Sequence, residues 1–182
     1  MKMLKYIKLL ILIKFMLATQ ASASTSQTLL DDLAMSKTLT EARPIISALW
    51  DRWTNAHDTL DEKMLMQSGI NAMSTGRLEK AEKVFSKLIS QNPNFTEAWN
   101  KRATVRFMLL NYEASLNDVF EVLKREPRHF GAISGLGLIY MRLGDLEGAL
   151  DAYQNLKEVF PASPEVEQLI PMIQKKLKLN EL

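Results

Sequence analysis

The fold is decided by the stretch FGAISGLGLIYMRLGDLEGALDAYQNLKEVFPAS, residues 130–163, because its key residues recur along the chain at one interval. Three prolines, Pro93, Pro127 and Pro161, are each 34 residues apart. This interval is the length of a helix-turn-helix unit that stacks on copies of itself. The other positions that recur in register are Gly69/Gly137, Gly76/Gly144, Ala81/Ala149, Phe85/Val119/Tyr153 and Leu88/Val122/Leu156.

These residues resemble the tetratricopeptide repeat (TPR), whose pattern runs Trp, Leu-Gly, Tyr, Ala, Phe, Ala, Pro over 34 residues. The resemblance implies an all-α solenoid with three repeats, at 62–95, 96–129 and 130–163. It also implies that the protein binds other polypeptides, without saying which. TPR stacks bind partners on a concave surface lined by the first helix of each repeat.

The resemblance places ten residues in the centre of this groove, and they are mostly apolar and rich in methionine. They are Met66, Ile70, Met73, Asn100, Thr104, Phe107, Met108, Leu138, Met141 and Arg142. Thioether side chains adapt to varied shapes and recur on promiscuous surfaces. Two arrangements remain open at this stage, because the groove is either free for a partner or filled by the protein's own terminal helices. A carboxylate clamp, as in chaperone-binding TPR domains, is rejected because Ser134 and Leu138 are uncharged where a cationic pair is needed.

The second repeat departs from the pattern with two arginines. Arg102 and Arg106 stand where Leu and Tyr are usual, four residues apart and therefore on one face of a helix. One interpretation is a cationic ligand site next to His129. The favoured interpretation is structural, with the arginines paired to Glu113, Asp118, Glu121 or Glu126, because a buried arginine requires a partner. His129 is then expected to bond a backbone group.

Residues 24–61 and 164–182 flank the repeats and are predicted to be helical caps. The N-terminal segment carries an apolar stripe that includes Trp50 and Trp53. We interpret it as a capping hairpin, or a degenerate repeat, that covers the open face of the first repeat. The C-terminal helix begins at Pro164 after the capping residue Ser163, and Pro171 is expected to kink it.

Residues 1–23 have the features of a cleaved secretory signal peptide. Lysines precede an apolar stretch from Leu9 to Ala18, and Ala21-Ser22-Ala23 offers a cleavage site. The alternative is an uncleaved anchor, which requires about 20 apolar residues, whereas Lys14 interrupts this stretch. A lysine-rich signal on a chain without cysteine is typical of bacteria. The expected compartment is the periplasm, with release to the medium as the alternative and no stable membrane anchor after cleavage.

Composition excludes several classes of function. The 182 residues contain no cysteine, so disulfides, thiolate nucleophiles and cysteine metal sites are excluded. Removal of residues 1–23 would leave 19 basic and 21 acidic residues, which gives no electrostatic case for nucleic acid binding. The two histidines, His57 and His129, have no metal-ligand spacing, and there is no glycine-rich phosphate loop. The sequence therefore predicts a protein-binding adaptor that is not an enzyme and has no cofactor. The alternatives are a self-associating scaffold, a subunit of an envelope complex, or a secreted factor.

Overall fold

The structure, a computed structural model, describes residues 26–180, which are entirely helices and short turns. A helix over residues 26–35 comes first. The following helices are α2 (Leu39–Thr54), α3 (Leu60–Ser74), α4 (Leu78–Gln91), α5 (Thr96–Met108), α6 (Tyr112–Arg125), α7 (Phe130–Leu143), α8 (Leu146–Val159) and α9 (Pro164–Asn180). This described part contains no strand, which agrees with the predicted all-α class. The helix α9 continues through Pro171.

Each 34-residue window holds one pair of helices, and in the first and third pairs a glycine lets the two helices approach. A Cβ added at Gly69 of α3 would lie 2.4 Å from the ring of Phe85 on α4. A Cβ at Gly137 of α7 would lie 2.8 Å from the ring of Tyr153 on α8. Both distances are far below van der Waals contact, so only glycine fits under these rings. The recurring Gly and aromatic positions in the sequence are therefore the two sides of one contact.

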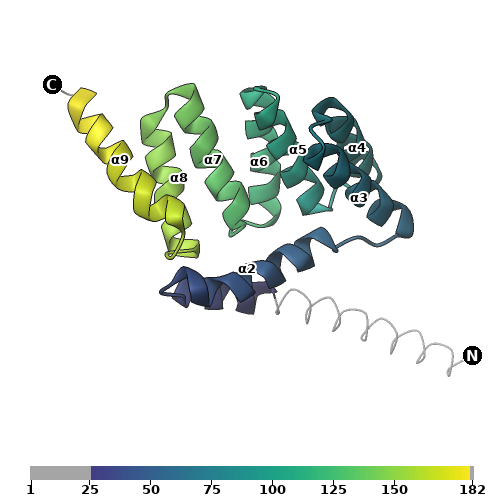
Figure 1. Cartoon of the computed structure of the whole chain (residues 1–182), viewed down its shortest axis with the longest axis horizontal. Helices are drawn as coiled ribbons and strands as arrows, with labels where there is room; N and C mark the ends of the chain where they lie inside the picture. The colour runs from purple at the N-terminus through teal and green to yellow at the C-terminus, as the bar shows by residue number, and fades with distance from the viewer. Residues whose placement is uncertain (1–25, 181–182) are drawn as a thin grey trace, which may run out of the picture.

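The pairs α3–α4, α5–α6 and α7–α8 stand side by side, α9 closes the row, and α2 runs beneath it (Figure 1). Two larger core clusters form at the ends of the row. The first-repeat cluster is built by α3, α4 and α5, around Phe85 and Phe95. The third-repeat cluster gathers residues of α7, α8 and α9 around Tyr153.

The N-terminal helices belong to the third-repeat cluster, although the sequence analysis predicted that they would cover the first repeat. Leu30, Leu33, Leu49 and Trp53 are buried in the same cluster as Phe130. The prediction of buried tryptophans was correct for Trp53, which is 8% exposed, but the predicted position of the cap was wrong. The physical reason is that the turn before α7 offers aromatic rings to pack against, and Arg128 there forms an ion pair with Asp31 at 2.6 Å.

Residues 26–180 contain no candidate for a membrane-spanning helix. None of their helices combines the length and the hydropathy that a bilayer crossing requires. The predicted signal peptide, residues 1–23, lies outside the described residues.

Candidate binding groove

The ten residues predicted to line the groove all lie on α3, α5 and α7, the first helices of the three pairs. Their exposure to solvent differs along the helix axis. Thr104, Met108, Leu138 and Arg142 are exposed, Ile70, Met73, Phe107 and Met141 are half-buried, and Met66 and Asn100 are buried. The accessible members lie toward the C-terminal ends of these helices, so one half of the groove is open and the other is covered.

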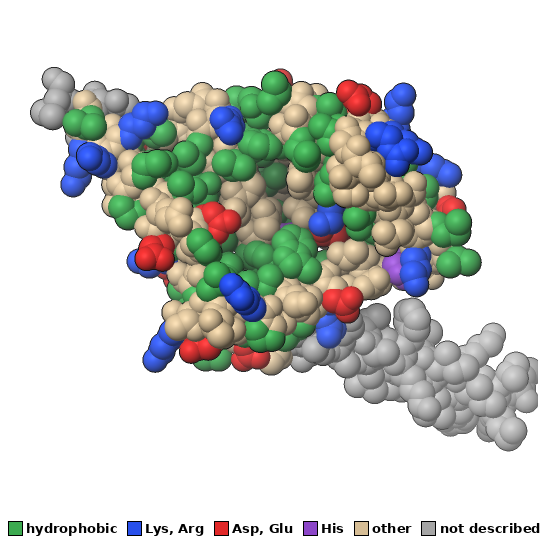
Figure 2. Space-filling view, in the orientation of Figure 1, with side chains coloured by type: hydrophobic (Ala, Val, Ile, Leu, Met, Phe, Trp, Pro, Cys, Tyr) green, Lys and Arg blue, Asp and Glu red, His purple; other side chains and the backbone are tan. Residues whose placement is uncertain are grey.

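The covering element over the second and third repeats is α2. The Trp50 indole lies against Gly131 of α7, where an added Cβ would be 2.5 Å from it. The Lys101 ammonium of α5 lies 5.0 Å from the centroid of the Trp50 ring, which is a cation–π contact. Figure 2 shows a hollow above α2 with hydrophobic side chains at its border. The helix α2 therefore covers the N-terminal ends of α5 and α7, while Thr104, Met108, Leu138 and Arg142 further along these helices are exposed.

Beneath α2 lies a buried polar cluster built around the Glu97 carboxylate, whose side chain is completely buried. Three groups donate to it: Nε2 of His129 at 3.1 Å, Nζ of Lys101 at 2.9 Å and Nδ2 of Asn100 at 3.1 and 3.2 Å. The His129 ring stacks on Trp53 with a centroid distance of 4.0 Å and an angle of 18°. This cluster joins the turn before α7 to α5. Trp53 of α2 covers the cluster on its other side.

The hydrogen bonds of His129 identify its tautomer. Its Nδ1 accepts from the backbone N–H of Ala132 at 3.1 Å, so the ring proton is on Nε2, which donates to Glu97. His129 therefore caps α7, which confirms the expectation that it bonds a backbone group. Burial raises the pKa of Glu97, but the hydrogen bond from His129 and the Lys101 charge outweigh burial, so the net pKa is lowered.

The arginine pair forms a structural network. Arg102 donates two hydrogen bonds to the Asp118 carboxylate, at 2.8 and 2.9 Å, and one to Ser86 on α4 at 3.0 Å. Arg106 contacts the same carboxylate at 3.0 Å and Glu82 on α4 at 2.8 Å. The structural interpretation of Arg102 and Arg106 is thus confirmed with Asp118 as the shared partner, while Glu82 was not among the expected acids. The network ties α4, α5 and α6 together.

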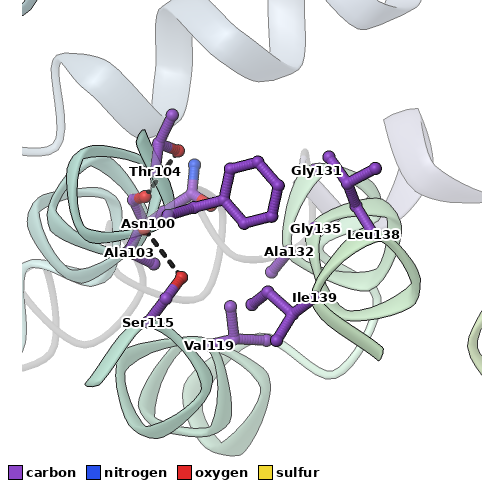
Figure 3. Close-up of a pocket in the computed structure, with 11 residues that line it drawn as sticks. Asn100, Ala103, Thr104, Ser115, Val119, Gly131, Ala132, Gly135, Leu138 and Ile139 are labelled. Carbon is purple, nitrogen blue, oxygen red and sulfur yellow. Dashed lines mark hydrogen bonds between the residues drawn. The ribbon is translucent and has the colours of Figure 1, made fainter. Parts of the chain in front are cut away.

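A pocket opens between α5, α6 and α7, and its lining extends from Gly131 beneath Trp50 to the exposed Thr104 and Leu138. It is lined by Asn100, Ala103, Thr104, Phe107, Ser115, Val119, Gly131, Ala132, Gly135, Leu138 and Ile139. Figure 3 shows residues of α5 on one side, Gly131, Gly135 and Leu138 of α7 on the other, and Val119 of α6 at the base. Two hydrogen bonds use its hydroxyl groups, Ser115 to the Ala103 carbonyl at 2.7 Å and Thr104 to the Asn100 carbonyl at 3.0 Å.

Residues 26–180 offer no evident metal centre. Within them no group of three or more His, Asp or Glu side chains is arranged to hold a metal ion.

The helix pairs and their groove agree with a family model described as the tetratricopeptide repeat, which matches residues 66–125 and 109–164. The chain belongs to the tetratricopeptide repeat family. A TPR repeat-containing protein of Rhizobium etli is 34% identical over 117 residues. The match covers 64% of this chain and 57% of the relative, so the chain spans little more than half of that protein's length.

Solved TPR structures share the fold at low identity. The first TPR domain of Spaghetti (RPAP3), bound to an HSP90 peptide, has a TM-score of 0.64 at 21% identity, covering 66% of this chain and 96% of that one. The type III secretion chaperone SycD of Yersinia enterocolitica, in complex with a peptide of the translocator YopD, has a TM-score of 0.61 at 16% identity. That match covers 70% of this chain and all of SycD. Both structures hold a peptide.

Sequence reasoning missed two features of this TPR structure. One is Gly135, which lines the pocket. The repeat pattern does not require a glycine at this position, so its presence could have been noticed. The strained Leu110 was also missed, with φ +63 at the position that Gly76 and Gly144 occupy in the other repeats. Both signals were present in the aligned windows, since each is a residue that the repeat register does not explain.

Proposed function

We propose that this chain is a non-enzymatic adaptor that binds a segment of another protein in the open half of its concave groove. The observation that carries the proposal is the accessible apolar surface on α5 and α7, where Met108 and Leu138 are 47% and 38% exposed beside the half-buried Phe107 and Met141. Exposed apolar residues gathered on a concave surface are typical of binding sites. Peptides held by Spaghetti and by SycD, which share the fold, support this class of function.

The polar residues of the groove suggest how a segment would be oriented. Asn100 already donates to both oxygens of Glu97 and is buried, so it offers little to a partner. Arg142 is exposed at the C-terminal end of α7. We therefore assign orientation of the segment to Arg142, which can hold a carboxylate in two parallel hydrogen bonds, and anchoring to Phe107 and Met141.

The test compares two phenylalanines on opposite helices of one repeat. Phe107→Ala removes the proposed anchor, and Phe120→Ala removes a 47% exposed ring from α6, which is not among the groove helices. Aromatic anchors contribute about 2 kcal/mol or more. Phe107→Ala should therefore weaken capture of partners at least tenfold, measured by quantitative pull-down from envelope fractions. Phe120→Ala should capture the same proteins as the wild type.

Equal capture by both variants would place the binding surface elsewhere, and the Trp50 and Trp53 region of α2 would then be the next candidate. If the protein's mass rises with concentration and Phe107→Ala abolishes the rise, the partner is a second copy. That outcome would favour the self-associating scaffold over the adaptor.

We further propose export to the bacterial periplasm with cleavage after Ala23. The basis is the lysine-rich start, the apolar stretch and the Ala21-Ser22-Ala23 pattern. Mass spectrometry of cell fractions should find a mature N-terminus near Ser24 in the periplasm. An N-terminus at Met1 in the membrane fraction would mean an uncleaved anchor, and accumulation in the medium would mean a secreted factor.

A further inference from the structure

One glycine of the groove has no structural reason to be a glycine. Four of the five glycines inside helices face an atom that a Cβ would strike. These contacts are Gly69 with Phe85, Gly131 with Trp50, Gly137 with Tyr153, and Gly148 with the carboxylate of Asp145. At Gly135, in the middle of α7, an added Cβ would meet nothing within 4 Å, and the φ angle is not positive.

A glycine in this place weakens the helix without relieving any clash. Glycine is the least favourable residue in a helix interior after proline, because it loses the most backbone freedom. What Gly135 does provide is space, since it forms part of the wall of the pocket between α5, α6 and α7. The geometry therefore connects the glycine to the pocket, not to the packing of the repeat.

The lining of the pocket favours an apolar side chain. None of its eleven lining residues is charged, and six of them are the aliphatic or aromatic side chains Ala103, Phe107, Val119, Ala132, Leu138 and Ile139. Its Ser115 and Thr104 hydroxyls donate to backbone carbonyls, and the Asn100 amide donates to Glu97. A carboxylate group would lose its hydration here without gaining a hydrogen-bond donor, which is unfavourable.

The space suits one side chain. The cavity volume is about 90 Å³, well below the roughly 300–1,000 Å³ of small-molecule sites. Resting on the proposed function, we propose that the partner segment inserts a single Leu or Met side chain into this pocket, and that Gly135 is the residue that admits it. Segments with Asp or Glu at that position are then rejected.

The first experiment measures the pocket directly, without a natural partner. The probe is N-acetyl-leucine methylamide, titrated into the purified protein and followed by methyl NMR of Val119, Leu138 and Ile139. These resonances should shift with the leucine probe and not with N-acetyl-aspartate methylamide. Gly135→Leu, which places a leucine side chain in the pocket, should abolish the shifts. Gly135→Ala should weaken them and melt about 2–4 °C higher, because its methyl group takes up pocket space while alanine favours the helix.

The second experiment uses a phage library of random twelve-residue peptides selected on the wild-type protein. Enriched peptides should share a Leu or Met, should lose at least tenfold in affinity when that residue becomes Ala, and should lose as much against Gly135→Leu. Peptides that bind Gly135→Leu and wild type equally would overturn the pocket assignment while leaving a binding groove. Pocket shifts with the leucine probe and no enriched peptide would instead contradict the adaptor function and leave the pocket standing. Absence of shifts with the leucine probe would overturn the proposal outright, and melting curves of both variants verify that they are folded.

Discussion

The second and third repeats hold the same helical pair together with different chemistry. At matching positions the second repeat has Arg102, Arg106 and Asp118, and the third has Leu136, Tyr140 and Ala152. The second repeat is joined to α4 by directional hydrogen bonds to Ser86 and Glu82. The third repeat belongs to an apolar cluster shared with α9 and the N-terminal helices. The comparison indicates that the helix pair of each 34-residue repeat depends on the close crossing of its two helices. The contacts around that crossing can be either apolar or ionic.

The largest effect is expected from Asp118→Ala. This change gives the second repeat the residue of the third, but it leaves Arg102 and Arg106, whose side chains are only 12% and 19% exposed, without their shared carboxylate. Removing one partner from a buried ion pair costs about 3 kcal/mol or more. Urea unfolding should therefore show a loss of this size. The triple change Arg102→Leu, Arg106→Tyr and Asp118→Ala transfers the whole third-repeat set and should recover most of the loss. If the triple variant is as unstable as the single one, the two packing solutions are not interchangeable.

The close crossings are tested by Ala149→Leu in the third repeat and Ala81→Leu in the first. Both alanines are completely buried, and overfilling such a site costs about 1–3 kcal/mol. Thermal melting should register the loss in both variants. Melting at the wild-type temperature would mean that the crossings tolerate extra volume and that these alanines do not mark the repeat register.

A smaller effect, of opposite sign, is expected at the turn after α5. Leu110 has φ +63 and is 71% exposed, where Gly144 has φ +81 in the third repeat. A left-handed conformation costs a non-glycine residue about 1 kcal/mol. Leu110→Gly should therefore stabilise the protein by about 1 kcal/mol in urea unfolding. Leu110→Ala is the control and should give no such gain, because alanine keeps the strained backbone. A gain with alanine would point instead to the removal of exposed apolar surface.

The smallest expected effect is a change in acid sensitivity at Glu97, which has Gly131 as its counterpart in the third repeat. Its folded pKa is lowered, so its contribution to stability is present above the usual value of about 4.5 and is lost as the pH falls through the folded pKa. Glu97→Gln should therefore make the unfolding free energy fall less steeply between roughly pH 5 and pH 3. Parallel curves for the variant and the wild type would show that Glu97 does not contribute to acid unfolding.

The sequence predicted the repeats well because their contacts are local and periodic. Gly137 meets Tyr153 sixteen residues away, so the same spacing reappears in the first repeat as Gly69 and Phe85 and can be read from an alignment of the windows. The arginine pair was also predictable, since two charges on a face that consensus repeats bury require a nearby acid.

The covering of the groove could not be predicted in the same way. The helices over 26–54 have no repeat register, and their partners lie far along the chain, up to the separation of 97 residues between Asp31 and Arg128. An apolar stripe indicates that a helix is buried but not against what. The stripe with Trp50 and Trp53 was therefore assigned to the nearest repeat in sequence, and the division of the groove into a covered and an open half followed only from the structure.

The docking of the N-terminal helices on the third repeat has a consequence for the order of folding. In an ordinary repeat array each unit contacts only its neighbours, so folding can begin anywhere and spread. Here Trp50 and Trp53 emerge from the ribosome before Phe130, one of the rings they pack against, exists. At about 5–20 residues per second the delay is roughly 4–16 s. During that interval the two indoles remain without their native packing surface.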